Sequence, residues 1–248
     1  MQSTPRLALA ETLGSGLDCS STMAEKARTQ KRLNTTLNVN LIGQYGSGKG
    51  TQAAFLARDF KLLNFSTGQA LRDNIKAGSV LGRKAQAIVE AGELVPSVLV
   101  GELLGAALDK LRPAQGIVVD GFTRNFEQKE MFDRVMQERG RTPIHVFINV
   151  SRETAFSRLS KRKVCDGCGD VPVLTKLDEA ACKKCGGKLV TRHDDRPDLI
   201  QKRLNLYDTE IAPVVEAYRK AGVLNEVDGE PSPEKVHEQI TAVVKKAA

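Results

Sequence analysis

Tryptophan is absent from this 248-residue sequence, and aromatic residues make up only 4% of it. A chain so poor in aromatic side chains is a weak candidate for a nucleic-acid-binding surface on which bases stack. Apolar runs are also short, and none approaches the ~18–20 residues that a helix needs to cross a bilayer. No internal repeat or low-complexity tract is visible. We therefore expect neither a nucleic-acid partner nor a membrane partner.

The cysteines lack the spread of a disulfide framework. Cys19 stands alone, and the other four fall in one short stretch: Cys165, Cys168, Cys182 and Cys185. Such crowding favours a reducing compartment and a metal clip rather than disulfides. The pattern is Cys-x2-Cys, thirteen residues and a second Cys-x2-Cys.

Four thiolates at this spacing suit a tetrahedral Zn²⁺ ion. The gap between the pairs is slightly shorter than in usual zinc ribbons, so a redox pair and unbound thiols remain alternatives. A zinc ion here would be structural, because a segment of ~30 residues buries too little apolar surface to fold alone. Four cysteines complete the coordination, so the neighbouring His193 is expected not to be a ligand.

Composition is ordinary for a globular protein, with 41% hydrophobic and 27% charged residues. The length allows one substantial core with small inserted subdomains. The formal net charge of +7 suits an anionic partner, and several arginines fall in motifs that would line a polyphosphate site. We expect the protein to act as a monomer.

The stretch with the clearest chemistry is residues 43–51, Gly-Gln-Tyr-Gly-Ser-Gly-Lys-Gly-Thr. It follows a predicted strand over 37–42 and precedes a predicted helix over 52–60, which is the context of a phosphate-binding loop. Its glycines allow backbone N–H groups to turn inward, and the helix N-terminus adds partial positive charge. Lys49 is placed to reach the β- and γ-phosphates of a nucleotide. Gly50 occupies the usual hydroxyl position, and Thr51 follows it.

Strands and helices alternate along the rest of the chain. Further strands are predicted over 116–120, 144–150 and 222–228, and helices over 69–91 (broken near 78–79), 96–111, 121–139, 152–163, 196–221 and from 233. This alternation predicts an α/β fold whose parallel sheet is covered on both faces. The active site of such a sheet lies beyond the carboxyl ends of its strands, where the glycine loop, Asp120 and residues 121–124 should meet.

Residues 1–36 are expected to form an irregular extension. Residues 6–10 resemble the start of an amphipathic transit peptide, but Glu11 and Asp18 argue against it because transit peptides are poor in acidic residues. We expect a cytoplasmic protein, with a mitochondrial location as the alternative.

Four groups of residues, in this order and at this spacing, resemble the adenylate kinase family. They are residues 43–53, Ser66-Thr67-Gly68 with Leu71-Arg72, Asp120-Gly121-Phe122 with Arg124 and Gln128, and Arg192 with Asp194-Asp195. The resemblance spans residues 38–245. It implies a P-loop three-layer fold with a core over 37–65, 96–160 and 196–248. It further implies a nucleoside-monophosphate-binding insert over 66–95, and a lid over 161–195 with the four-cysteine zinc site.

The resemblance also implies reversible, Mg²⁺-dependent phosphoryl transfer, ATP + AMP to two ADP, and a role for each matching residue. The implied catalytic residues are Lys49, Arg124, Arg162, Arg192 and Arg203. The implied ATP-binding residues are Gly46, Ser47, Gly48, Lys49, Gly50, Thr51, Arg158 and Arg162. The implied AMP-binding residues are Thr67, Arg72, Glu93, Leu94, Val95, Gly121, Phe122, Thr123, Arg124, Gln128, Arg192 and Arg203. Asp120 would hold Mg²⁺ through water.

Several positions depart from the family pattern. Tyr45 and Thr123 stand where proline is usual, Gln69 replaces an aspartate, and Lys163 replaces an arginine. The alternatives are therefore another nucleoside-monophosphate kinase, such as one using GTP as donor, and a weakly active nucleotide sensor. A zinc-ribbon nucleic-acid binder is a further alternative, but it leaves the glycine loop unexplained.

Overall fold

The computed structural model describes residues 36–172 and 181–247. The expected irregular extension, with Cys19 and the transit-like residues 6–10, lies outside the described residues except for Thr36. The part of the chain between the two cysteine pairs, 173–180, also lies outside them. Among the described residues, no helix combines the length and the apolar character that crossing a membrane requires.

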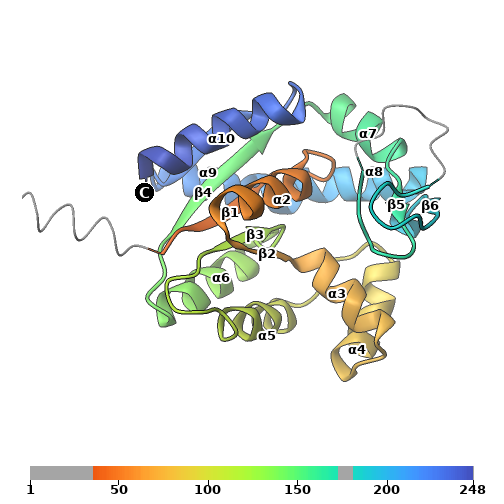
Figure 1. Cartoon of the computed structure of the whole chain (residues 1–248), viewed down its shortest axis with the longest axis horizontal. Coiled ribbons are helices and arrows are strands. Elements are labelled where there is room, and N and C mark those ends of the chain that lie inside the picture. The colour runs from red at the N-terminus through yellow and green to blue at the C-terminus, as the bar shows by residue number, and fades with distance from the viewer. Residues whose placement is uncertain (1–35, 173–180, 248) are drawn as a thin grey trace, which may run out of the picture. The chain divides into compact units, whose positions relative to one another are not determined.

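A five-stranded parallel sheet forms the centre of the fold (Figure 1). Its strands are β1 (Asn38–Ile42), β2 (Leu63–Ser66), β3 (Ile117–Asp120), β4 (Pro143–Asn149) and β7 (Leu224–Asp228), in the order β2-β3-β1-β4-β7. Every neighbouring pair is parallel, so all carboxyl ends meet at one edge. The predicted α/β fold with a central parallel sheet is confirmed. The β2 strand had not been predicted as one.

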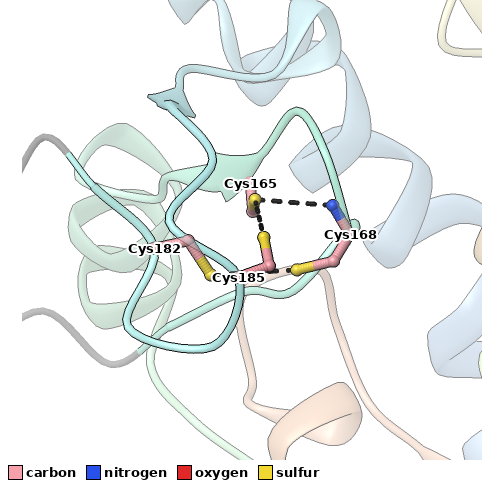
Figure 2. A group of neighbouring side chains, drawn as sticks. All are labelled: Cys165, Cys168, Cys182 and Cys185. Atoms are coloured by element: carbon pink, nitrogen blue, oxygen red, sulfur yellow. Dashed lines mark hydrogen bonds between the residues drawn. The ribbon is translucent and has the colours of Figure 1, made fainter.

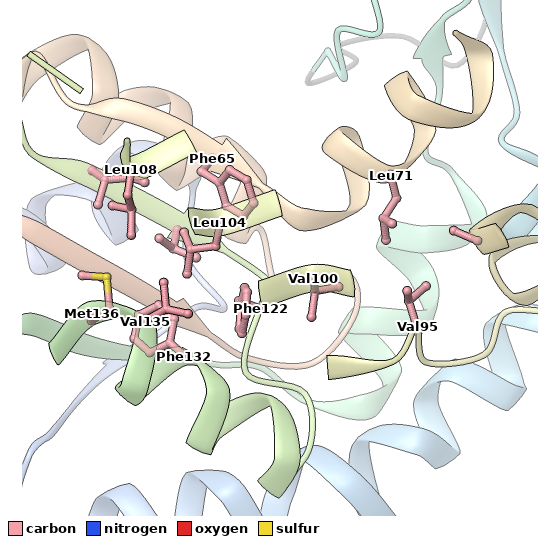
Figure 3. Close-up of a cluster of buried hydrophobic side chains, with 13 residues drawn as sticks. Phe65, Leu71, Val95, Val100, Leu104, Leu108, Phe122, Phe132, Val135 and Met136 are labelled. Carbon is pink, nitrogen blue, oxygen red and sulfur yellow. The ribbon is translucent and has the colours of Figure 1, made fainter. Parts of the chain in front are cut away.

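Helices cover both faces of this sheet. On one face α2 (Lys49–Phe60) and α10 (Pro233–Ala247) bury Leu56 and Ile240 against strand residues such as Leu41. On the other face lie α5 (Ser97–Leu108), α6 (Phe126–Glu138) and α9 (Ala212–Lys220). A cluster of thirteen buried side chains joins β2 and β3 to α5 and α6, and Figure 3 shows Phe122 among them. The central layer is mainly apolar on both sides, as is usual for buried parallel strands, with Asn38, Asn40 and His145 as buried polar side chains.

Two short helices, α3 (Thr67–Lys76) and α4 (Val80–Glu90), follow β2. The predicted break near residues 78–79 is confirmed, and the Ser79 hydroxyl caps α4 by accepting from the Gly82 amide at 2.9 Å. Ser66 is the N-cap residue of α3, but its hydroxyl makes no capping bond. It donates instead to the Asp120 carboxylate, 3.2 Å away.

The helix predicted over 152–163 is shorter than expected. The structure has α7 (Arg152–Ser160), so Arg162 lies beyond its end. In the predicted helix, Arg158 and Arg162 would be four residues apart on one face. That expectation is wrong, because only Arg158 lies in α7. After α7 come a small hairpin of β5 (Val164–Cys165) and β6 (Leu189–Val190), and then a 3₁₀ turn (His193–Asp195).

The long helix predicted over 196–221 is interrupted. It consists of α8 (Pro197–Leu206), a π-helical turn (Tyr207–Ile211) and α9. Pro213 explains the interruption, because it lacks an amide hydrogen and its ring clashes with the carbonyl one turn earlier in a regular α-helix. The wider turn, in which the Ala212 amide bonds to the Tyr207 carbonyl, brings Pro213 to the start of α9.

Candidate active site

The glycine loop leaves the carboxyl end of β1 and enters α2. Gly46 and Gly48 have φ angles of 83° and 92°, which favour glycine. A Cβ atom at Gly46 would lie 2.6 Å from the Ala155 carbonyl oxygen, so any other residue would push the loop away from α7. The loop is therefore both curved and closely packed, as an anion-binding backbone cradle must be.

Lys49 points back into this loop. Its Nζ atom lies 2.7 Å from each of two carbonyl oxygens and 3.3 Å from a hydroxyl, those of Gly43, Gln44 and Ser47 respectively. Burial lowers the pKa of Lys49 to about 8; Asp120 opposes the shift, and Arg124, Arg203 and Arg162 add to it. A site that holds this many cations with so little negative charge is prepared for an anionic ligand.

Two aspartates at the 3₁₀ turn hold three arginines. Arg162 forms two hydrogen bonds to Asp195, at 2.8 and 2.6 Å, and Arg192 forms two to Asp194, at 2.9 and 2.6 Å. Arg203 contacts both carboxylates, at 3.1 and 3.3 Å. Burial by itself would raise the pKa of Asp194, but Arg192 and Arg203 overcome it and hold the pKa at about 2. The three guanidiniums are thus fixed before any ligand arrives.

Arg124 follows β3 and reaches the glycine loop at Tyr45. Its Nε donates to the Gly121 carbonyl at 2.7 Å, and its Nη1 lies 3.1 Å from the Tyr45 hydroxyl. The Tyr45 ring also faces Arg203, whose Cζ is 4.3 Å from the ring centroid. Tyr45, recognised in the sequence only as a departure from the family pattern, thereby contacts two of the predicted catalytic arginines.

Gln128 is buried at the start of α6. Its amide nitrogen donates to the Val95 carbonyl at 3.0 Å, and its amide oxygen accepts from the Arg124 backbone N–H at 3.2 Å. The buried hydroxyl of Thr67 has no hydrogen-bond partner within the described part of the chain. A buried hydroxyl without a hydrogen bond destabilises the fold, so a polar ligand atom that binds here would supply the missing partner of Thr67.

Arg72 projects from α3 towards the same space. Burial and, after it, the positive charge of Arg192 lower the pKa of Arg72 to about 10. Its Nη2 donates to the Gln69 amide oxygen at 2.8 Å, and the Gln69 amide nitrogen donates to Asp73 at 2.7 Å. Gln69 therefore links Arg72 to a carboxylate, a connection that its sequence position does not reveal.

Asp120 ends β3 beside the glycine loop. One carboxylate oxygen accepts from Ser66 and would lie 3.5 Å from a Cβ atom at Gly50. A carboxylate at a strand end, facing a phosphate loop, is a suitable oxygen ligand for Mg²⁺ or for its bound water.

The basic side chains described above line one cavity of about 980 Å³, together with Asp120, Asp194, Thr67 and Gln128. Its walls include every predicted nucleotide-binding residue except Phe122, together with Asp120. The Phe122 side chain is fully buried and packs on Phe132, with ring centroids 5.5 Å apart, so only its backbone can serve a ligand.

Part of the wall was not predicted from the sequence. It comprises Phe55 together with Gly229, Pro231, Pro233 and Val236, which follow β7 or begin α10. Arg158 donates to the carbonyl oxygens of Gly229 and Glu230, at 3.0 and 3.1 Å, which closes this end. Because β7 ends at the same edge as β1 and β3, its position in the sheet was the one available signal.

The four predicted zinc ligands come together outside this cavity (Figure 2). Their Sγ atoms all lie within 4.8 Å of one another. The Cys168 amide donates to the Cys165 Sγ at 3.4 Å, and this bond is the main reason why the pKa of Cys165 falls to about 7. Four cysteine sulfurs this close together fit the ligand set of a tetrahedral zinc ion.

Comparison with known proteins agrees with this geometry. The family model described as adenylate kinase matches residues 41–223. A protein named adenylate kinase from Caldanaerobacter subterraneus subsp. tengcongensis is 35% identical over 209 residues, which cover 82% of this chain and 94% of that protein. Proteins of the same name from Desulforudis audaxviator and Methanocella arvoryzae are each 36% identical and cover 83% and 84% of this chain and 98% of their own length. The chain therefore belongs to the adenylate kinase family of phosphotransferase enzymes.

Proposed function

We propose that this enzyme transfers the γ-phosphoryl group of Mg²⁺-bound ATP to AMP, reversibly, and so forms two ADP molecules. The observation that carries the proposal is the convergence of Lys49 and buried arginines on one cavity with two ends. Phosphoryl transfer between nucleotides needs positioning and charge neutralisation far more than it needs a general base.

The donor end is the one formed by the glycine loop. Its N–H groups and Lys49 would hold the β- and γ-phosphates, and Arg158 and Arg162 would approach from the other side. The wall of Gly229, Pro231 and Val236 is apolar and lines the same cavity as the loop, so we assign it to the adenine of ATP.

The acceptor end lies between α3, α5 and α6. Arg72 and Arg124 would grip the AMP phosphate, with Arg192 and Arg203 between the two ends. Thr67, the backbone of residues 93–95 and Gln128 would contact the base. Backbone groups of residues 121–123 would complete this pocket.

Two metals belong to the proposal. Asp120 would hold the water shell of the Mg²⁺ ion that accompanies ATP, and Mg²⁺ would neutralise charge on the phosphates. Cys165, Cys168, Cys182 and Cys185 would bind a structural Zn²⁺, which would give the surrounding hairpin its stability.

The insert over 66–95 and the lid over 161–195 are proposed to close over the nucleotides and exclude water from the transfer. Gly169 already lies close to Gln69: a Cβ atom on Gly169 would lie 3.4 Å from the Gln69 amide nitrogen. We further propose a cytoplasmic monomer that acts in adenine nucleotide balance. The crowded cysteines support a reducing compartment.

A coupled assay with ATP, Mg²⁺ and each nucleoside monophosphate tests the proposal. We expect turnover with AMP, a weak response to UMP and CMP, and loss of activity in Lys49→Ala. A preference for GTP as donor would indicate another monophosphate kinase. Tight ATP binding without transfer to any acceptor would favour a nucleotide sensor.

A further inference from the structure

We propose that Tyr45 is a positioning residue that holds Arg124 and Arg203 ready for the acceptor phosphate. The inference rests on the proposed function, since it uses the assignment of Arg124 to the AMP phosphate and of Arg203 to the space between the two ends of the cavity. It concerns a position where the family pattern has proline, which offers neither an aromatic face nor a hydroxyl group.

Tyr45 contacts two arginines, Arg124 and Arg203. Its hydroxyl oxygen accepts a hydrogen bond from Arg124 at 3.1 Å, and the Cζ atoms of Arg124 and Arg203 lie 5.1 and 4.3 Å from its ring centroid. Both distances are within the range of cation–π attraction. One side chain of the glycine loop therefore touches two guanidiniums that come from separate parts of the sequence.

Charge explains why such a contact matters. Arg203 is buried, and Arg162 and Arg192 act on it with like charge. Asp194 and Asp195 hold Arg203 from one side, while no carboxylate within the described residues pairs with Arg124. The ring of Tyr45 therefore stabilises the positive charge of both guanidiniums, and its hydroxyl adds a hydrogen bond to Arg124.

The ring is itself well anchored. It packs against one buried cluster that contains Ile42 and Ile211, and against a second that contains Leu159 and Leu204. A rigid ring limits the orientations of the two guanidiniums, so these side chains lose less conformational entropy when AMP binds.

Three variants separate the hydroxyl, the ring and simple packing. Tyr45→Phe removes the hydroxyl and keeps the ring, and Tyr45→Leu removes both. Tyr207→Phe is the matched control, because the Tyr207 side chain packs on the same cluster as Tyr45. Its backbone N–H donates to the Arg203 carbonyl, a bond that phenylalanine keeps. Each purified full-length protein is assayed for kcat and for KM of AMP. AMP and ATP dissociation constants follow from calorimetry, and Tm is measured.

We expect Tyr45→Phe to raise the AMP KM by roughly 3–5-fold, in the lower part of the range for losing one hydrogen bond, because Tyr45 acts on AMP only through Arg124. Tyr45→Leu should lower kcat/KM for AMP by roughly 10–30-fold, because two cation–π contacts are also lost. The ATP dissociation constant should stay within about twofold of the original, and Tyr207→Phe should resemble the unaltered enzyme.

An AMP dissociation constant that Tyr45→Leu leaves unchanged would overturn the inference. So would an equal weakening of ATP binding, or losses that follow Tm alone, since either would reduce Tyr45 to a packing role. Failure of the unaltered enzyme to use AMP is a different result, because it contradicts the proposed function and not the contacts of Tyr45.

Discussion

Arg162 and Asp195 form a two-point ion pair in which the carboxylate is completely buried and the guanidinium is 20% exposed. The same carboxylate also accepts from Arg203 at 3.1 Å. Asp195 thus joins two of the proposed catalytic cations: it orients Arg162 and, together with Asp194, Arg203.

Replacement of this anion should be costly. Asp195→Asn is expected to lower the free energy of unfolding by about 3 kcal/mol, because breaking a buried pair leaves like charges facing each other. It should also lower kcat by roughly 100-fold, since two phosphate-binding groups lose their orientation. Urea denaturation and the coupled assay measure the two effects.

The control for this variant is Asp198→Asn. Asp198 pairs with Arg196 at 3.3 Å, but both side chains are more than half exposed. Its replacement should change stability by less than about 0.5 kcal/mol. Equal effects of the two substitutions would contradict the role given to Asp195.

Lys49 should make ATP binding sensitive to alkaline pH. Its pKa of about 8, lowered from 10.5 by burial, means that the free enzyme loses this charge as pH rises through 8. We expect kcat/KM for ATP to fall roughly tenfold per pH unit above that point. Bound phosphates favour the ammonium, so kcat at saturating ATP should decline only at higher pH. A flat kcat/KM profile to pH 10 would refute this expectation.

The same shift has a consequence for stability. Between pH 8 and 10.5 the unfolded chain binds a proton at Lys49 that the folded chain does not. The free energy of unfolding therefore rises with pH through that window. Below pH 8 Lys49 is charged in both states, and burial of this charge then destabilises the folded chain most. Comparison of unfolding curves of the protein and its Lys49→Met variant at pH 7 and 10 measures the difference.

Zinc removal should loosen the hairpin of β5 and β6. We expect one zinc ion per chain by metal analysis, and its release on treatment with a thiol reagent and a chelator. Cys168→Ser should abolish binding and lower Tm by ~5 °C or more, because metal-binding energy is folding energy in so small a unit. Cys19→Ser is the matched control and should retain the metal. Full occupancy in Cys168→Ser would refute the four-cysteine site.

Gln128 should govern the choice of acceptor. Gln128→Leu is expected to raise the AMP KM by roughly 10–100-fold, because the buried amide that bonds to Val95 and Arg124, and that we propose to pair with the base edge, is lost. Gln137→Leu, on an exposed part of the same helix, is the control. Initial rates with AMP, UMP and CMP provide the measurement, and an unchanged AMP KM would exclude Gln128 from the base pocket.

Local patterns predicted much of this fold. The glycine loop between an alternating strand and a helix identified the β1–α2 unit, and apolar runs identified β3 and β4. The break between α3 and α4 at residues 78–79 could also be predicted, since Gly78 is a typical turn residue and Ser79 a typical helix N-cap. Each of these signals is contained within a few neighbouring residues.

Features that depend on distant contacts could not be predicted in the same way. The Arg158 guanidinium binds the carbonyl of Gly229, 71 residues away, and no local pattern encodes that pairing. Tyr45 looked like a departure from the family pattern until the fold brought Arg124 and Arg203 to its ring. Arg162 lies beyond the end of α7, because the chain turns there towards Asp195.

The π-helical turn at Tyr207–Ile211 makes chain length itself a constraint. Each residue advances an α-helix by about 100°, so deletion of one residue from this turn would rotate α9 by that angle relative to α8. Val214, Val215 and Tyr218 would then swing away from the sheet, although every one of them was still present. Homologous chains that keep the same proline should therefore keep the same number of residues between Arg203 and Tyr218, even where the amino acids at these positions differ.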